Sequence, residues 1–135
     1  MINKMFLSII PVSYVRTTQK QKYVDKTYHK YYAYKEHIQT LVKGKLKKLE
    51  GPISLVVTFY MPIPKNGKSC GVKVKEGQFH ISTKDLDNLV KGLLDALNGI
   101  AFIDDKQVCQ INSEKVYSHN PGIGFELWEL EEEQN

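Results

Sequence analysis

Two acidic pairs lie close together in the chain and carry the residue types most able to do chemistry: Asp85 and Asp87, one residue apart, and the adjacent Asp104 and Asp105. If three such carboxylates meet at about 4 Å, each pair repels by roughly 1–4 kcal/mol. A cluster of this kind needs a bound cation or raised pKa values to persist. Hard oxygen ligands with no nearby His or Cys pair favour Mg²⁺ or Mn²⁺ over zinc. We therefore expect Asp85, Asp87 and Asp105 to hold one or two of these ions, with Asp104 the weaker candidate of its pair.

The first acidic pair stands at the start of a predicted amphipathic helix. Ser82 and Asp85 have capping-box spacing, although Asp replaces the usual Glu or Gln, and Gly99 is a stop signal. On a regular helix Asp85 and Asp87 would point about 200° apart. They can converge only if Asp85 lies in an extended segment and Asp87 in the first helical turn. The residues expected on the buried face are Leu86, Leu89, Val90, Leu93, Leu94 and Leu97.

Asp105 follows the predicted helix after a short connection. A helix runs away from its own start, so the chain has to return before Asp105 can meet Asp85 and Asp87. An antiparallel strand from Lys106 onward, running beside the segment that leads into the helix, would achieve this. The alternative interpretation is that these acids only stabilise the helix N-terminus and form a polar stripe on its surface.

The remaining segments predict one α/β domain over residues 1–135. Apolar alternation predicts strands near residues 1–10 and over 53–61, 107–117 and 123–129. An apolar stripe predicts a helix over about residues 28–49, with Gly44 inside it and Gly51-Pro52 ending it. The order strand, helix, strand, helix, strand, strand suggests a mixed β-sheet with two main helices packed on it. Residues 131–135 form a polar tail.

Residues 84–99, followed by 104–108 and 115–117, resemble the RusA family of Holliday-junction resolvases. The run Met-Pro-Ile-Pro-Lys over residues 61–65 is also similar to that family. The resemblance implies a RusA-like fold, crossover junction endodeoxyribonuclease activity, and a homodimer that cuts symmetrically placed strands of four-way DNA. It also implies roles for three residues at matching positions: Lys91 in catalysis, Asp95 in support of the metal ligands, and Lys115 as a phosphate contact.

The expected reaction is metal-assisted hydrolysis of phosphodiester bonds, in which the cation activates water for in-line attack. Lys91 lies one turn after Asp87 on the same helical face and could stabilise the scissile phosphate or the leaving oxygen. The alternative for Lys91 is a simple ion pair with Asp87, worth about 0.2–0.5 kcal/mol.

Basic and acidic residues are divided unevenly along the chain. Residues 1–75 hold fifteen Lys or Arg against three acids, and residues 76–135 hold four against twelve. This asymmetry suggests a polyanion-binding surface beside a cation-holding one, or merely lysines that keep helices soluble. Basic groups neutralise phosphates, and tyrosines interleaved with them can stack on bases exposed at a branch point. The candidate DNA contacts are Arg16, Lys20, Lys22, Lys26, Lys65, Lys68, Lys73 and Lys115.

Three of these lysines belong to the loop over residues 62–78, which we interpret as a mobile basic flap beside the site. An ordinary solvated loop is the alternative.

No segment is long enough to span a membrane, and the N-terminus lacks a signal-peptide cleavage site. Cys70 and Cys109 have no metal-ligand spacing, so a reduced, cytoplasmic setting is expected. We expect no organic cofactor.

Two other functions stay open at this stage. One is a non-catalytic DNA-binding or recombination accessory protein with a decayed acidic site. The other is a metal-dependent transferase or phosphatase that acts on a nucleotide or sugar phosphate, although no glycine-rich phosphate loop supports it.

Overall fold

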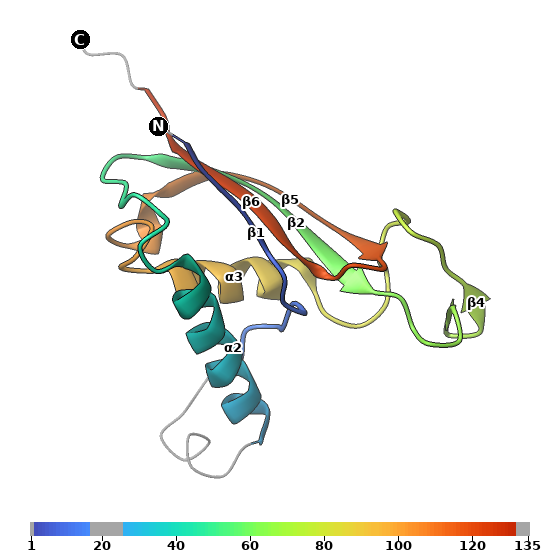
Figure 1. The fold of residues 1–135 in the computed structure, drawn as a ribbon. Coiled ribbons are helices and arrows are strands. Elements are labelled where there is room, and N and C mark those ends of the chain that lie inside the picture. The colour runs from blue at the N-terminus through green and yellow to red at the C-terminus, as the bar shows by residue number, and fades with distance from the viewer. Residues whose placement is uncertain (1, 17–25, 132–135) are drawn as a thin grey trace.

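A four-stranded β-sheet and two helices make up the body of the protein (Figure 1), described here from a computed structural model for residues 2–16 and 26–131. The predicted α/β fold with a mixed sheet and two main helices is confirmed. In chain order the elements are β1 (Ile2–Leu7), α2 (Lys26–Val42), β2 (Ile53–Pro62), β3 (Lys68–Ser69), β4 (Val72–Lys73), α3 (Leu86–Leu97), the 3-10 helix η1 (Asp105–Gln107), β5 (Val108–Ser118) and β6 (Gly122–Glu129).

The strands of the main sheet follow the order β1-β6-β2-β5. β6 is antiparallel to both β1 and β2, whereas β2 and β5 are parallel. A parallel pair cannot be closed by a tight turn and needs a crossover connection, which here contains α3. This crossover makes β5 an edge strand of the main sheet and brings it back beside the helix that precedes it.

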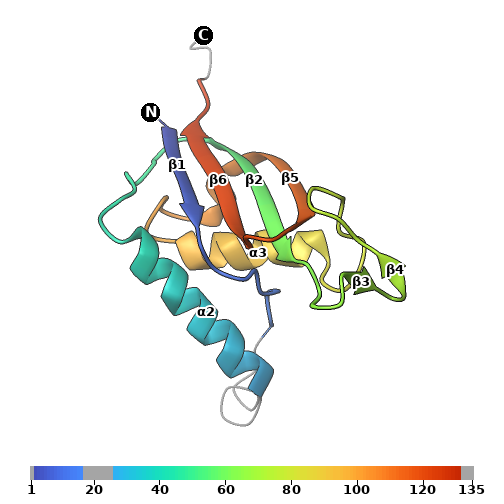
Figure 2. The ribbon, with the colours of Figure 1, turned by 45° about the vertical axis from the view of Figure 1, so that its right-hand side comes forward.

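Both helices lie on one face of the sheet (Figures 1 and 2). Their burial follows the predicted periodicities, because the apolar stripe of each helix and alternate residues of each central strand face the same core. Among the described residues no helix is long and apolar enough to cross a membrane. The largest fully buried side chains are Leu7, Ile38, Leu49, Ile53, Leu55, Phe59, Met61, Leu89, Leu93, Leu97, Phe102 and Ile123.

The predicted helix over residues 28–49 is wrong at its C-terminal end. α2 ends at Val42, and Gly44 follows with φ +73°, a left-handed conformation that glycine adopts without a Cβ clash. Gly51 and Pro52 therefore do not end this helix. Leu49 is nevertheless buried, and its backbone N–H donates to the Ala101 carbonyl in the connection after α2.

Two other expectations need correction. The loop over residues 62–78 contains the short β3–β4 hairpin, in which Lys68 pairs with Lys73 and Ser69 with Val72. The capping box proposed for Ser82 and Asp85 is absent. Asp85 is itself the N-cap of α3, and its side chain makes no capping hydrogen bond.

Candidate active site

A groove of about 360 Å³ lies between α3 and the edge strand β5. Its α3 wall consists of residues that repeat every three or four positions and so share one helical face. Its β5 wall consists of alternate residues, which share one face of the strand. The residues lining it are Asp87, Val90, Lys91, Leu94, Asp105, Ile111 and Ser113. Three residues expected to carry chemistry, Asp87, Lys91 and Asp105, are therefore in one groove.

Asp85 and Asp87 have the local conformations that their convergence requires. Asp85 has extended φ and ψ angles of −68° and 137°, and Asp87 lies in the first turn of α3. The free N–H groups and the dipole at a helix N-terminus favour both carboxylates. Asp85 is exposed and is not among the residues lining the groove. Over residues 2–16 and 26–131, no three His, Cys, Asp or Glu side chains are grouped closely enough to hold a metal ion.

Asp104 and Asp105 differ in role although they are adjacent. Asp104 is the N-cap of η1, where its Oδ1 accepts from the Lys106 N–H at 3.0 Å. Gln107 completes this cap, because its Oε1 accepts from the Asp104 N–H at 2.9 Å. Asp105, the next residue, turns its side chain toward the groove. Asp104 thus caps η1, a structural role that was not predicted when it was considered as a weaker candidate metal ligand.

The pKa of the Asp105 carboxyl is raised above its usual range. Burial is the main cause, followed by a hydrogen bond that the protonated Asp105 carboxyl donates to Asp104, and by the negative charges of Asp104 and Asp95. The positive charge of Lys91 acts in the opposite direction. The pKa of Asp104 is lowered instead, chiefly by the Lys106 N–H. Asp105 is therefore a carboxylate among acids, where a cation would favour its charged form.

Lys91 does not form the simple ion pair with Asp87 that was the alternative for it, as judged from the ion pairs of residues 2–16 and 26–131. Its ammonium instead lies 4.4 Å from the centroid of the Tyr14 ring. Tyr14 is held against α3 by a hydrogen bond from its backbone N–H to the Asn88 carbonyl. The side chain of Lys91 is thus kept beside the groove by an aromatic contact that the sequence did not reveal.

Asp95 connects the two helices. Its Oδ2 accepts a hydrogen bond of 2.6 Å from the Tyr31 hydroxyl and lies 3.3 Å from the Lys35 ammonium, both on α2. Burial and the contact with Asp95 raise the pKa of Tyr31, so that its hydroxyl stays a donor. Asp95 also contributes to the raised pKa of Asp105. These contacts are compatible with the expected supporting role of Asp95.

The segment that leads into α3 runs antiparallel to β5, as predicted. Gly77 and Tyr117 are joined by a hydrogen bond from the Gly77 N–H, and the His80 N–H donates to the Lys115 carbonyl. His80 is buried against the Tyr117 ring, and burial together with nearby Lys115 lowers its pKa. Residues 77–80 therefore pair with the outer edge of β5, and the chain then enters α3 beside the groove.

The expected DNA contacts are distributed over three parts of the chain. Arg16 and Lys26 are exposed on either side of residues 17–25, whereas Lys20 and Lys22 lie outside the described residues. Three further lysines are exposed on the hairpin segment, which extends away from the body (Figure 1): Lys65, Lys68 and Lys73. Lys115 differs from all of these, because it is half-buried and donates to backbone carbonyls.

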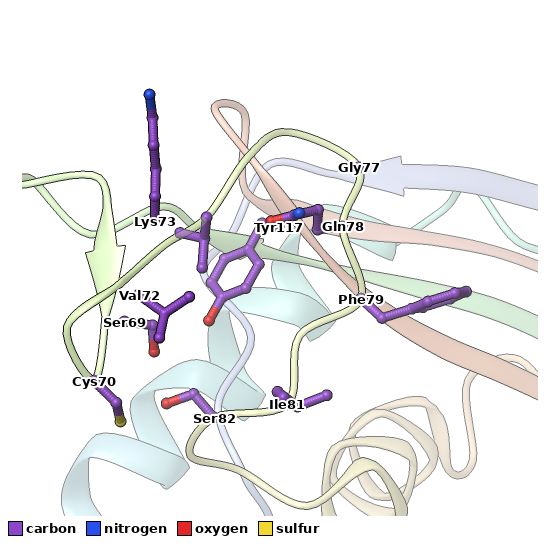
Figure 3. A pocket seen from close by; sticks show the side chains of 11 residues that line it. Ser69, Cys70, Val72, Lys73, Gly77, Gln78, Phe79, Ile81, Ser82 and Tyr117 are labelled. Atoms are coloured by element: carbon purple, nitrogen blue, oxygen red, sulfur yellow. The ribbon is translucent and has the colours of Figure 1, made fainter.

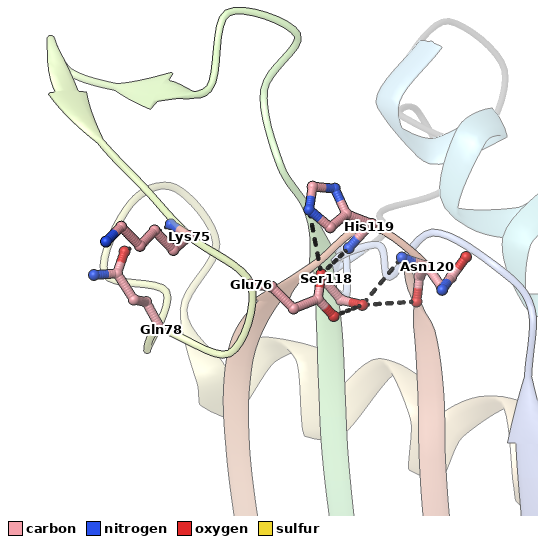
Figure 4. A network of polar contacts seen from close by, with 6 residues as sticks. All are labelled: Lys75, Glu76, Gln78, Ser118, His119 and Asn120. Carbon is pink, nitrogen blue, oxygen red and sulfur yellow. Dashed lines mark hydrogen bonds and ion pairs between the residues drawn. The ribbon is translucent and has the colours of Figure 1, made fainter.

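A second, larger pocket of about 600 Å³, also mainly apolar, lies between the hairpin and the segment that leads into α3 (Figure 3). Tyr117 stands in its centre, with Val72 and Ile81 on facing sides. The base of the hairpin is fixed separately by Glu76, whose carboxylate accepts from the Ser118 hydroxyl and the His119 N–H (Figure 4). The lining of this pocket contains no acidic residue, whereas Asp87 and Asp105 line the α3–β5 groove.

Comparison with known proteins agrees with this reading of the fold. The family described as Endodeoxyribonuclease RusA matches residues 11–127, which include every residue of the groove. The chain is also 38% identical over 86 residues to an uncharacterized protein, YqaN, of Bacillus subtilis (strain 168). That alignment covers 61% of this chain and 61% of the Bacillus protein, so the chain spans about six tenths of the length of this curated relative.

Proposed function

This chain belongs to the RusA endodeoxyribonuclease family, and from that premise we propose that it is an Mg²⁺-dependent endonuclease that resolves four-way DNA junctions. One observation supports the proposal above the others. Asp87 and Lys91 of α3 and Asp105 of η1 share one solvent-open groove between α3 and β5. Two carboxylates and one ammonium group in the same groove are suited to metal-assisted hydrolysis of a phosphodiester bound there.

The donor set of the groove fits Mg²⁺ or Mn²⁺. Mg²⁺ commonly keeps several waters and binds proteins through one or two carboxylates together with substrate phosphates. We propose that Asp87 and Asp105 hold the ion, with Asp85 reaching it from the helix cap. When bound, the ion supplies an acidified water and offsets negative charge at the phosphate. The acids around Asp105, which raise its pKa, provide the local negative charge that such an ion requires.

Lys91 is proposed to contact the scissile phosphate. Its ammonium is exposed, lies beside the Tyr14 ring and has no ion-pair partner among the described residues. A positive charge held near the developing negative charge of a transition state lowers the barrier without any need for reorganisation.

The basic residues are proposed to hold the arms of the junction. Arg16, Lys26 and the three exposed hairpin lysines are available to phosphates, and Lys20 and Lys22 extend the same basic sequence. A homodimer would present two grooves related by a two-fold axis, which suits paired cuts in a branched substrate with similar symmetry.

The test uses purified protein with Mg²⁺ on four-way, flap and linear duplex DNA of the same sequence. We expect paired nicks in the four-way junction, and loss of those nicks with EDTA or in Asp87→Asn. Junction binding by Asp87→Asn should persist or tighten, because one negative charge near the DNA is removed. Glu126→Gln is the matched control, since this carboxylate forms an ion pair with exposed Lys4 on the face of the sheet away from the helices.

Four outcomes would count against the proposal. Undiminished cleavage by Asp87→Asn would remove the assigned groove from the reaction. Junction binding by the wild type without nicking would favour the non-catalytic accessory protein, and activity on small phosphate esters alone would favour a phosphatase. Binding that does not weaken between about 50 and 200 mM salt would contradict the basic DNA surface.

A further inference from the structure

The backbone of Lys84 has an unusual conformation directly before the first acidic pair. Its φ is +78°, a left-handed value that residues with a Cβ adopt rarely and glycine adopts readily. Such conformations persist only where neighbouring contacts maintain them, and they concentrate at functional sites. Lys84 immediately precedes Asp85, the N-cap that determines where α3 begins.

Two lysine ammonium groups maintain this turn. The Nζ of Lys115 on β5 donates to the Lys84 carbonyl at 2.6 Å and to the Ser82 carbonyl at 3.5 Å. The Nζ of Lys84 donates to the Pro11 carbonyl at 3.0 Å. Hydrogen bonds from an ionised donor are shorter and stronger than neutral ones. The ammonium of Lys115 is therefore used inside the protein, on the backbone that leads into the groove.

The sheet register explains how this contact acts on the site. Lys115 pairs with Phe59 of β2, and Ser113 pairs with Val57, so the two β5 side chains lie on the same, helix-facing side as the core. Ser113 lines the groove, and Lys115 lies two residues farther along the same face. The contact therefore joins the β5 wall of the groove to the start of its α3 wall.

We propose that Lys115 is a positioning residue, which holds the left-handed turn at Lys84 and so sets the direction of Asp85 and Asp87 toward the groove. The inference rests on the proposed nuclease function for its activity readout. It replaces a phosphate contact, which the resemblance implied for Lys115, by a contact with the protein backbone.

The experiment compares Lys115→Met with a double variant that adds Lys84→Gly. Methionine keeps most of the apolar stem but has no ammonium, and glycine accepts the positive φ without help. We expect Lys115→Met to lower the single-turnover cleavage rate by about 10²-fold, the scale of a small misplacement of catalytic groups. Its junction Kd should stay within about twofold, and its salt dependence should be unchanged. The double variant should recover a large part of the rate. Lys106→Met, which removes an exposed lysine of η1, is the matched control.

A second readout does not need activity. Backbone amide shifts of Asp85 and Asp87 in NMR spectra should move in Lys115→Met and return toward wild type in the double variant. Unchanged shifts, a wild-type cleavage rate in Lys115→Met, or no recovery with Lys84→Gly would each overturn the inference. Weaker junction binding with a salt slope smaller by about one unit would identify Lys115 as a phosphate contact instead. If the wild type fails to cleave any substrate while the shifts respond as expected, the proposed function fails and the positioning role stands.

A separate observation concerns the apolar pocket of Figure 3. Three large apolar side chains beside it are strongly exposed: Val72 by 66%, Phe79 by 70% and Ile81 by 92%. The backbone of Phe79 and Ile81 is fixed, since Phe79 bridges to Val116 and His80, which lies between them, is hydrogen-bonded to β5. Exposed apolar groups on a fixed backbone are typical of binding surfaces.

The surroundings of this pocket are basic. Lys65, Lys68, Lys73 and Lys75 are exposed on the same segment, whereas the nearby Glu76 is engaged with Ser118 and His119. An apolar surface with a cationic rim suits a base that has left the stack, because the base packs on the surface while the rim binds its phosphates. The same segment continues into the acidic helix, so a base held here would lie on the DNA path toward the groove.

We infer that Phe79 and Ile81 contact unstacked bases at the branch point of the junction, an inference that also rests on the proposed function. The test is a four-way junction with 2-aminopurine at the crossover, bound in Ca²⁺ so that it is not cleaved. Wild type should raise the 2-aminopurine fluorescence, and Phe79→Ala/Ile81→Ala should abolish that rise. The double variant should also lose about tenfold in preference for junction over duplex, the scale of stacking on one base. Phe6→Ala, at an exposed aromatic residue of β1, is the control.

An unchanged fluorescence rise or an unchanged junction preference in the double variant would overturn the inference. So would conversion of a dimer to a monomer in sedimentation, because the patch would then be covered by a second copy of the chain. If wild type itself does not bind the junction, the proposed function fails as well.

Discussion

The carboxylates at the base of the hairpin and those in the α3–β5 groove have opposite surroundings. Glu76 accepts from the His119 N–H at 2.6 Å and from the Ser118 hydroxyl at 3.0 Å (Figure 4). These donors, the His119 N–H above all, lower its pKa. Asp105 lies among other acids, and burial together with their charges raises its pKa. The protein therefore stabilises the ionised form of Glu76 and disfavours the ionised form of Asp105.

The difference separates structural acids from the acids for which we propose a function. Asp104 and Glu129 resemble Glu76, because backbone N–H groups bind each of them and lower its pKa. Asp95 is bound by a hydroxyl and an ammonium of α2. A carboxylate whose lone pairs are used by donors contributes to folding. A carboxylate beside an open groove and other acids is suited to a cation that arrives from solution.

The largest expected effect comes from the adjacent pair at η1. Asp105→Asn should reduce Mg²⁺-dependent cleavage by about 10²-fold or more, on the scale that loss of one groove charge can reach. Asp104→Asn should lose much less activity, because asparagine caps a helix as well as aspartate does and only a neighbouring charge is removed, not a proposed ligand. The measurement is single-turnover cleavage of a four-way junction. Equal losses in the two variants would contradict the division between structural and functional acids.

Stabilisation by Mg²⁺ tests the same division without DNA. An ion that binds only the folded protein at about 100 times its Kd stabilises it by about 2.7 kcal/mol. We expect Mg²⁺ to raise the Tm of wild type, and Asp87→Asn and Asp105→Asn to lose most of that increase. Asp85→Asn should lose less, because Asp85 is at the cap and does not line the groove.

Glu126→Gln is the control for the Mg²⁺ experiment, and EDTA should return the wild-type Tm to its starting value. A Tm increase that survives in Asp87→Asn and Asp105→Asn but disappears in Glu76→Gln would reverse the assignment of the two regions.

Much of the fold was predictable because the sequence periods are local. Alternation over 53–61 and the leucine repeat of α3 each determine one buried face, and both were predicted correctly. The end of α2 was not, because Leu49 extends the helical spacing although it returns to the core by another route. The two-residue strands β3 and β4 were missed because such short segments carry no period.

The site was predictable in residue type more than in arrangement. Acid spacing predicted Asp87 and Asp105 as site residues, but the groove that both line depends on the parallel pairing of β2 with β5. The contact of Tyr31 with Asp95 spans 64 positions, and no local pattern reports it. The left-handed backbone of Lys84 was also hidden, because lysine carries no signal for positive φ.

Removal of the Tyr31 hydroxyl should have an intermediate effect, on stability more than on cleavage. Tyr31→Phe deletes a hydrogen bond to a charged acceptor, which is worth about 1.5 kcal/mol of unfolding free energy. The measurement is urea unfolding followed through Trp128 fluorescence. Tyr32→Phe, at the adjacent exposed position, is the control and should leave the unfolding midpoint unchanged. An equal midpoint for Tyr31→Phe and wild type would mean that the hydrogen bond from Tyr31 to Asp95 does not stabilise the folded protein.

The smallest effect concerns the titration of Glu76. Because its pKa is lowered in the folded state, the stability it contributes is complete above the ordinary carboxyl pKa of about 4.3 and is lost as the pH falls through its own lower value. The ¹³C titration midpoint of its carboxyl should therefore lie below that ordinary value. Ser118→Ala should raise the midpoint more than His119→Ala, since alanine at 119 keeps the backbone N–H and removes only an imidazole 3.8 Å away. A midpoint at or above the ordinary value would mean that the protein does not stabilise the ionised form of Glu76. The contrast between Glu76 and the groove acid Asp105 would then be lost.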